Sequence, residues 1–117
     1  RLALASSSPR ANIEQVLREL AILPLFEVIA SGNDFRESKP NPEIYLHVAA
    51  ELHAKPQQCT VIEDSTYGIQ AAIRAGMRVL AKRDQRYGFD QSPAHALFDD
   101  LAEIPALLEG RPADALH

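Results

Sequence analysis

Three polar clusters, at residues 6–8, 31–39 and 63–65, contain the side chains best suited to chemistry on a phosphate group. The groups of interest are serine hydroxyls in the first, the Lys39 ammonium in the second and two adjacent carboxylates in the third. Hydroxyl and backbone N–H groups bind anionic oxygens, an ammonium neutralises their charge, and carboxylates hold a divalent cation. Each cluster also has an ordinary structural explanation, which competes with the functional one.

The first cluster contains Ser6 and Ser7 and lies between an apolar run at residues 2–5 and a helical pattern. Serine hydroxyls and the free N–H groups of a helix N-terminus together form an anion site, so Ser6 and Ser7 are candidate phosphate-binding residues. The competing explanation is that the serines only cap the helix, with Ser8 as the cap and Pro9 in the first turn. This segment alone does not separate the two.

Lys39 is the last residue of the second cluster, and it precedes Pro40. A residue before proline avoids the helical region, so Lys39 and Asn41 are both expected in extended backbone. A lysine on such a rigid segment can neutralise a phosphate or a nearby carboxylate, which makes Lys39 a candidate catalytic and phosphate-binding residue. Taken alone, the segment favours a solvated loop lysine.

The third cluster, Glu63-Asp64, directly follows the apolar run at residues 59–62. Two adjacent carboxylates at the end of a buried strand repel one another, and a divalent cation relieves that repulsion. Mg²⁺ commonly takes one or two protein carboxylates together with phosphate oxygens, so Asp64 and Glu63 are candidate metal ligands. The alternative is an acidic pair that only complements the dipole of the next helix.

Short apolar runs alternate with amphipathic helical patterns along the chain. Strands are predicted at residues 2–5, 26–30, 59–62, 77–81 and 96–98, and helices at residues 9–21, 42–52, 66–75 and 101–109. This alternation predicts a Rossmann-like, three-layer α/β/α fold with a mostly parallel sheet. Ligands of such sheets bind beyond the carboxyl ends of the strands, where the three clusters lie. Residues 1–109 are expected to form one partial α/β core domain, and residues 110–117 a flexible C-terminal tail.

The composition excludes several classes of partner. The net charge of −4 disfavours a nucleic-acid backbone or an anionic membrane surface, and no apolar run is long enough for a membrane span. No signal peptide is recognisable at the start of the sequence. A single cysteine, Cys59, excludes an intrachain disulfide and suits a reducing compartment, so a cytoplasmic location is expected.

Taken together, the clusters resemble motifs of the haloacid dehalogenase (HAD) superfamily. The segments that carry the resemblance are Leu-Ala-Ser-Ser-Ser at 4–8, Ser-Lys-Pro-Asn-Pro-Glu-Ile-Tyr at 38–45 and Val-Ile-Glu-Asp-Ser at 61–65, followed by Gly-Ile-Gln-Ala-Ala at 68–72 and Ala-Gly-Met at 75–77. They correspond in order to motifs II, III and IV, and are most similar to those of the β-phosphoglucomutase-like phosphatases and mutases. The patterns KPxPxxY and EDSxxGIxAAxxAG are together very specific.

The resemblance implies a role for each candidate residue. Ser6 would hydrogen-bond the transferring phosphoryl group, with Ser7 adding backbone and local contacts, and Lys39 would balance charge at that group and at the nucleophile. Asp64 would hold Mg²⁺ directly, and Glu63 directly or through water. The implied activity is Mg²⁺-dependent phosphoryl transfer on a small phosphorylated metabolite, a sugar phosphate among the candidates, by a phosphatase or a phosphomutase.

The sequence departs from the family pattern at motif I, because no Asp-x-Asp occurs in its 117 residues. The helical cap domain that follows motif I in these relatives is also absent. The chain is therefore expected to be a fragment, inactive alone, in which an N-terminal segment or a second chain completes the sheet between the strands at residues 2–5 and 59–62. The alternative is a truncated, non-enzymatic binding or assembly module.

Overall fold

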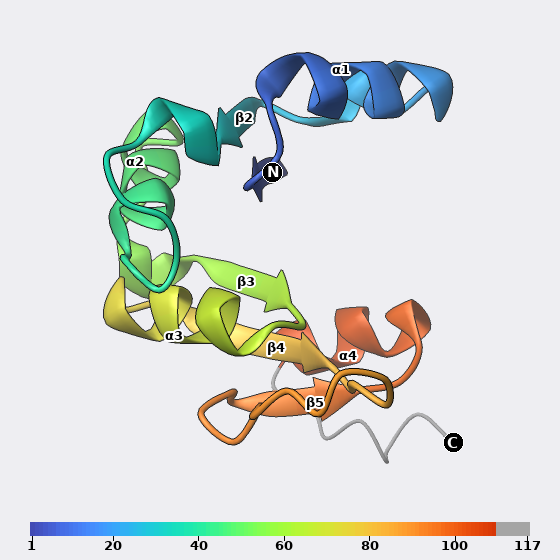
Figure 1. Cartoon of the computed structure of the whole chain (residues 1–117). Coiled ribbons are helices and arrows are strands. Elements are labelled where there is room, and N and C mark those ends of the chain that lie inside the picture. The colour runs from blue at the N-terminus through green and yellow to red at the C-terminus, as the bar shows by residue number, and fades with distance from the viewer. Residues whose placement is uncertain (110–117) are drawn as a thin grey trace.

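The computed structural model of the chain describes residues 1–109, and strands alternate with helices along it except that β5 follows β4 directly (Figure 1). The predicted tail, residues 110–117, lies outside the described residues. All nine expected strands and helices are present, and most of their ends lie within about two residues of the expected positions. The strands are β1 Ala3–Ser6, β2 Val28–Ser31, β3 Thr60–Glu63, β4 Arg78–Lys82 and β5 Ala96–Phe98. The helices are α1 Arg10–Glu19, α2 Glu43–Glu51, α3 Thr66–Arg74 and α4 Ile104–Leu108. None of the described helices has the length and apolarity needed to cross a bilayer.

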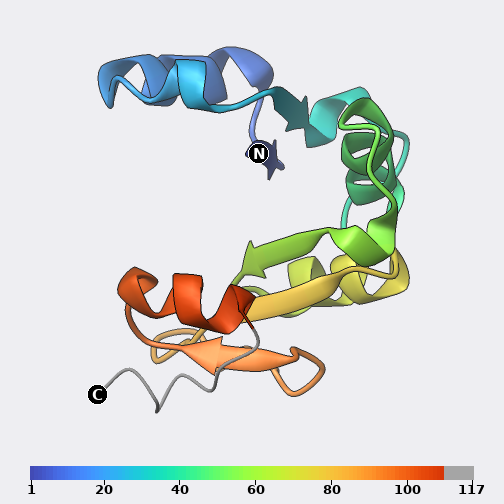
Figure 2. The ribbon, with the colours of Figure 1, turned by 180° about the vertical axis from the view of Figure 1, so that it is seen from behind.

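Every strand pairing among the described residues is parallel, as the alternation predicts. The strands form two sheets, however, with the orders β1-β2 and β3-β4-β5. Ala3 lies opposite Val28 in the first sheet, and Thr60 lies opposite Arg78 in the second. Figures 1 and 2 show the two sheets standing apart, with α2 beside both of them. β1 and β3 are therefore both edge strands.

One apolar core connects the two sheets through α2 and α3. It joins Ala30 of β2, Ala49 of α2, Ala72 of α3 and Val79 of β4, all of which are at most 2% exposed. The small side chains let the helices lie close to the strands, which is the packing role that the sequence suggests for the alanines of α3. Because α2 contacts β1, β2 and α3, the loop that precedes it is held between the two sheets.

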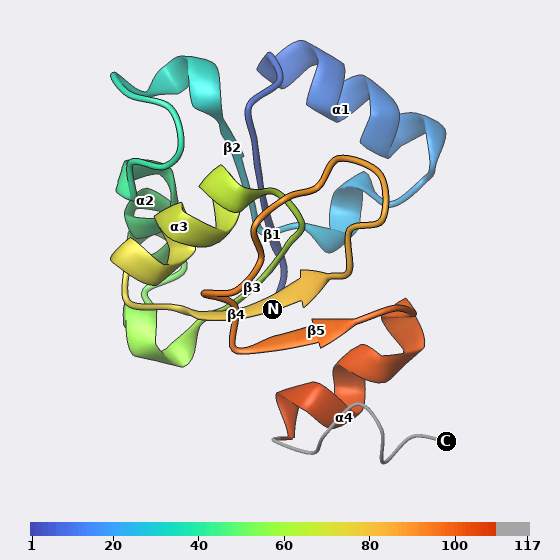
Figure 3. The same cartoon turned by 60° about the horizontal axis from the view of Figure 1, so that its bottom comes forward.

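A second, smaller core lies under α4 on the far side of the β3-β4-β5 sheet (Figure 3). Leu80, Phe98 and Leu107 are its buried members, each at most 2% exposed. Pro105 occupies the first turn of α4, where its missing N–H costs no hydrogen bond. The C-terminal helix is thus compatible with its proline.

One local prediction was wrong. Ser8 does not cap α1, which begins at Arg10 after Pro9 without any side-chain cap. The backbone N–H and carbonyl of Ser8 are bonded to Ser6 and Ser31 in a turn. The segment around Lys39 is a turn: the Lys39–Pro40 peptide bond is cis, and Asn41 N–H donates to the Ser38 carbonyl at 3.1 Å. The Asn41 side chain does accept the first N–H of α2, at 2.9 Å from Glu43 N.

Candidate functional site

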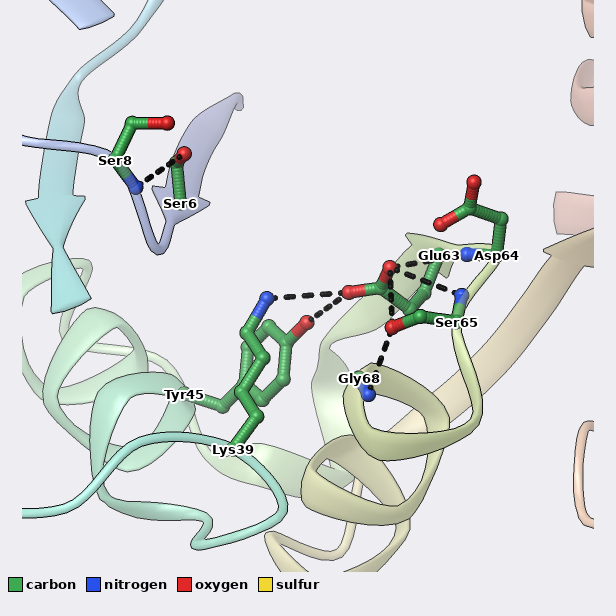
Figure 4. Close-up of polar contacts among 8 residues, drawn as sticks. All are labelled: Ser6, Ser8, Lys39, Tyr45, Glu63, Asp64, Ser65 and Gly68. Atoms are coloured by element: carbon green, nitrogen blue, oxygen red, sulfur yellow. Dashed lines mark hydrogen bonds and ion pairs between the residues drawn. The ribbon is translucent and has the colours of Figure 1, made fainter. Parts of the chain in front are cut away.

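The three polar clusters occur where β1, β2 and β3 end, and Figure 4 shows them facing one another. Ser6 closes β1, Lys39 lies in the loop between β2 and α2, and Glu63 closes β3. β1 and β2 are parallel neighbours, so their carboxyl ends meet, and the Lys39–Glu63 pair joins this edge to the end of β3 in the other sheet.

The serine cluster is fixed by hydrogen bonds between the ends of β1 and β2. Ser8 N–H donates to Ser6 Oγ at 3.1 Å, and Ser31 Oγ donates to the Ser8 carbonyl at 2.7 Å. A Cβ on Gly32 would lie 3.1 Å from Ser7 Cα, so glycine permits the close approach of the two loops. Because Ser6 Oγ already accepts a bond, its O–H proton is free to be donated to an anionic oxygen.

Arg10 has a structural position beside this cluster. Its guanidinium donates to the Ile29 carbonyl at 2.7 Å and pairs with Asp34 at 3.4 Å. These contacts tie the start of α1 to β2 and to the loop that follows it. Arg10 therefore helps to hold the serine turn.

Lys39 and Glu63 form a largely buried ion pair. The distance from Lys39 Nζ to Glu63 Oε2 is 3.2 Å, and both side chains are 14% exposed. Tyr45 O–H donates to the same carboxylate oxygen at 2.9 Å, and Lys39 Nζ lies 5.0 Å from the centre of the Tyr45 ring. Lys39 is therefore a fixed charge at the site, not the solvated loop lysine that the segment alone favours.

Tyr45 is the residue whose role the sequence left undecided. Its position in the apolar pattern of α2 predicts burial, and it is 6% exposed. The pattern gives no sign that its hydroxyl reaches β3. The only sequence signal was the tyrosine at the end of KPxPxxY, six residues after Lys39 and in the first turn of α2.

The second oxygen of Glu63 organises the loop that starts α3. Glu63 Oε1 accepts from Asp64 N–H at 3.0 Å and from Ser65 N–H at 3.4 Å. Ser65 in turn caps α3 by accepting from Gly68 N–H at 3.1 Å. Both carboxylate oxygens of Glu63 are thus bonded to protein groups, and one side chain links Lys39 to the Asp64 loop.

The hydrogen bonds and charges of this network shift three pKa values. Burial raises the pKa of Glu63, but the attraction of Lys39 and the bonds from Asp64 N–H, Tyr45 and Lys39 outweigh it, so the pKa lies below the ordinary value. Burial and the adjacent Glu63 charge raise the pKa of Tyr45, which keeps its phenol protonated as a donor. Burial and the neighbouring Glu63 carboxyl raise the pKa of Asp64.

Gly68 is required by this arrangement. A Cβ at Gly68 would collide with the Glu63 carboxylate, so that side chain would have to move away from its partners Lys39 and Tyr45. We expect Gly68→Ala to displace the carboxylate and to lower the free energy of unfolding by about 2 kcal/mol, the typical cost of overpacking. Urea unfolding measures this loss of stability. Ala71→Gly in the same helix is the comparison variant, because it removes a methyl group and creates space instead of overpacking. Stability equal to wild type in Gly68→Ala would show that Glu63 has another resting position.

Asp64 differs from Glu63 in that its side chain is exposed and points away from Lys39 and Tyr45 (Figure 4). A carboxylate that leaves the end of a strand toward solvent suits a Mg²⁺ ligand. Within residues 1–109, no group of three or more His, Cys, Asp or Glu side chains lies close enough to hold a metal. The donor set therefore fits the ion only in part: Asp64 is available, Glu63 is engaged, and further ligands must come from elsewhere.

A small pocket joins the serine and lysine clusters. Its volume is about 90 Å³, and it is lined by Ser7, Gly32, Asn33, Phe35, Glu37, Ser38, Lys39 and Ile44. Ser7 and Lys39 thus line one space, and Lys39 reaches the acidic loop through Glu63. The structure brings the five candidate residues to one end of the strands, while their chemical roles stay predictions.

Several known proteins are similar to this chain in sequence and in structure. A phosphorylated carbohydrates phosphatase of Thermotoga maritima is 40% identical over 119 aligned positions, which cover the whole of this chain and 50% of that protein. The crystal structure of CbbY from Rhodobacter sphaeroides in complex with phosphate has a TM-score of 0.82 and 32% identity, covering 89% of this chain and 48% of that one. β-Phosphoglucomutase from Clostridium difficile has a TM-score of 0.75 and 28% identity, over 92% and 49% of the two chains.

The chain therefore spans about half the length of the relatives that it matches. The sequence model of the haloacid dehalogenase-like hydrolases matches residues 1–82, which contain β1 to β4 and all three polar clusters. The parallel α/β arrangement agrees with that of the related structures. This chain belongs to the haloacid dehalogenase-like hydrolase family.

Proposed function

We propose that the complete protein is a Mg²⁺-dependent phosphatase that acts on a small phosphorylated metabolite. The observation that carries this proposal is the fixed Lys39–Glu63 pair, which lies between the serine cluster and the exposed carboxylate of Asp64. A buried ammonium beside hydroxyl donors suits a phosphoryl group, whose charge lies on its equatorial oxygens. A phosphomutase is the second candidate. That activity would require a larger contribution from the part of the protein outside this chain.

Each residue of the site would have a separate task. Ser6 would donate its free O–H proton to a phosphoryl oxygen, and Ser7 would present its backbone to the same group. Lys39 would neutralise phosphoryl charge while Glu63 and Tyr45 hold it in place. Asp64 would be a direct ligand of Mg²⁺, and Glu63 would act on the ion through water.

The reaction that fits this site proceeds in two displacements. An aspartate carboxylate attacks phosphorus, the ester P–O bond breaks, and the leaving oxygen takes a proton from an acid. Water then gives a proton to the conjugate base of that acid and attacks phosphorus, the aspartyl P–O bond breaks, and inorganic phosphate and the free aspartate carboxylate are released. Bound Mg²⁺ supplies charge neutralisation for the phosphoryl oxygens. The residues of this chain hold the phosphoryl group in line for both steps.

The nucleophilic aspartate would come from an additional strand between the two sheets. β1 and β3 each pair on one side only among the described residues, and apolar side chains lie exposed at these edges: Leu2 is 52% exposed and Ile62 is 49% exposed. Edges of this kind accept another strand. We propose that an N-terminal segment or a second chain supplies it, with an Asp-x-Asp at its end.

The substrate class that we propose is the sugar phosphates. The Thermotoga maritima relative is a phosphorylated carbohydrates phosphatase, and CbbY from Rhodobacter sphaeroides has been crystallised with xylulose 1,5-bisphosphate. The location that we propose is cytoplasmic, because the single cysteine, Cys59, is free.

Turnover of sugar phosphates by the complete protein tests the proposed function. We expect release of inorganic phosphate that requires Mg²⁺ and stops when a chelator removes it. The 117-residue chain, assayed in parallel, is expected to give background rates, since no Asp-x-Asp is present to attack phosphorus. Turnover by this chain that disappears in Asp64→Asn would show that the nucleophile lies within it. A complete protein with no turnover on any phosphate ester would favour a binding or assembly module.

A further inference from the structure

We propose that Gln91 is a positioning residue for the Asp64 loop, holding the backbone that aims the Asp64 carboxylate. Gln91 lies in the loop between β4 and β5, 27 residues after Asp64. It belongs to none of the segments that carry the family resemblance, which end at residue 77. The inference rests on the proposed function, because it assigns Gln91 a part in preparing that site.

The side-chain amide of Gln91 makes three hydrogen bonds to main-chain groups. Gln91 Nε2 donates to the Asp64 carbonyl at 2.9 Å and to the Lys82 carbonyl at 2.7 Å. Gln91 Oε1 accepts from Asp84 N–H at 3.0 Å. The two carbonyls need donors and the N–H needs an acceptor, so only this orientation of the amide satisfies all three. The side chain thus connects the end of β3 with the end of β4.

Asp64 is consequently held from both sides of its backbone. Its N–H donates to Glu63 Oε1 at 3.0 Å, and its carbonyl accepts from Gln91 Nε2 at 2.9 Å. A residue whose two peptide groups are both fixed has little freedom to rotate, so the direction of its side chain is set. Glu63 supplies the first restraint and is part of the site already described, whereas Gln91 supplies the second from outside it.

The loop that carries Gln91 is itself well ordered by Asp84. The Asp84 carboxylate accepts from the N–H groups of Arg86 at 3.0 Å, Tyr87 at 3.1 Å and Phe89 at 2.7 Å. These bonds close a turn within the loop without touching Asp64. Loop order and Asp64 anchoring therefore depend on different side chains, and substitution can separate them.

The test compares Gln91→Met with wild type in the complete protein. Methionine has similar length and no donor for the Asp64 carbonyl. Gln85→Met is the matched control, because Gln85 is exposed in the same loop. Binding of Mn²⁺, followed by the loss of the free-ion electron paramagnetic resonance signal, gives a readout independent of turnover. We expect Gln91→Met to weaken Mn²⁺ binding and to raise the Mg²⁺ concentration for half-maximal turnover by about 10-fold, as for other outer-shell changes. Gln85→Met should change neither.

Asp84→Ala distinguishes positioning from loop disorder. It removes the turn within the loop and keeps the Gln91 amide, so Mn²⁺ affinity should stay within about 2-fold of wild type if Gln91 acts on Asp64 directly. An equal loss in Asp84→Ala and Gln91→Met, or unchanged affinity in Gln91→Met, would overturn the inference while leaving the proposed function intact. If the wild-type protein shows no phosphatase turnover but Gln91→Met still weakens Mn²⁺ binding, the proposed function would be overturned. The role of Gln91 in positioning Asp64 would then be kept. A wild-type protein that binds no Mn²⁺ would overturn both.

Discussion

Asp64→Asn in the complete protein is expected to reduce Mg²⁺-dependent phosphatase turnover by about 10³-fold or to background. Asp64 is the one acid of the 63–65 cluster whose carboxylate is exposed and directed away from the Lys39 network. An amide keeps the size of the side chain but removes the negative charge that draws a divalent cation. Turnover measured across a Mg²⁺ titration, up to saturation, gives the loss and shows whether more metal restores activity.

The matched control for this variant is Asp99→Asn. Asp99 pairs with Arg83 at 2.9 Å on the surface, with 61% of its side chain exposed, and surface pairs of this kind contribute little. We expect this control to keep wild-type turnover and stability. Asp64→Asn with turnover within a few-fold of wild type at saturating Mg²⁺ would exclude Asp64 as a metal ligand.

Lys39→Met is expected to reduce turnover by about 10²- to 10³-fold, because it removes the only buried cation of the site. It should also lower the free energy of unfolding by about 2 to 4 kcal/mol, since the Glu63 carboxylate would lie largely buried without a cation. Steady-state kinetics of the complete protein measures the first effect, and urea unfolding measures the second.

A double variant separates the two effects of Lys39→Met. Adding Glu63→Gln removes the unpaired charge, so stability should partly recover while turnover stays low. A double variant as unstable as Lys39→Met would contradict the expected recovery and show that the unpaired Glu63 charge is not what destabilises Lys39→Met. Recovery of turnover would show that Lys39 acts only by balancing Glu63 and not on the phosphoryl group.

The same pair predicts a dependence of stability on pH. The pKa of Glu63 is lowered in the folded chain, so the stability that the pair contributes is fully present above the unfolded pKa of about 4.3. It is lost as the pH falls through the lower, folded pKa. In Lys39→Met the same carboxyl lacks its cation, so the stability difference between wild type and variant should be largest near neutral pH and narrow in acid. A constant difference across this range would contradict the assignment.

Local patterns were sufficient to predict the elements and their parallel pairing. The alternation of apolar runs with amphipathic patterns located five strands and four helices, because each element shows its own periodicity in a short window. The specific motifs KPxPxxY and EDSxxGIxAAxxAG were sufficient to predict the family, which the match over residues 1–82 confirms. The cap of α1 was mispredicted because contacts of Ser8 with β1 and β2, far from the helix pattern itself, fix the turn before the helix.

The sequence by itself determined which residues could do chemistry and that parallel strands would bring them to one edge. Only the tertiary structure decided which position and contacts each of these residues has in the site, because these depend on residues far apart in the chain. Glu63 turns inward to Lys39 and Tyr45, 24 and 18 residues earlier, whereas Asp64 turns outward. Gln91 reaches the Asp64 carbonyl across 27 residues. No spacing rule predicts such pairs, since the direction of a side chain at a strand end is set by what packs around it.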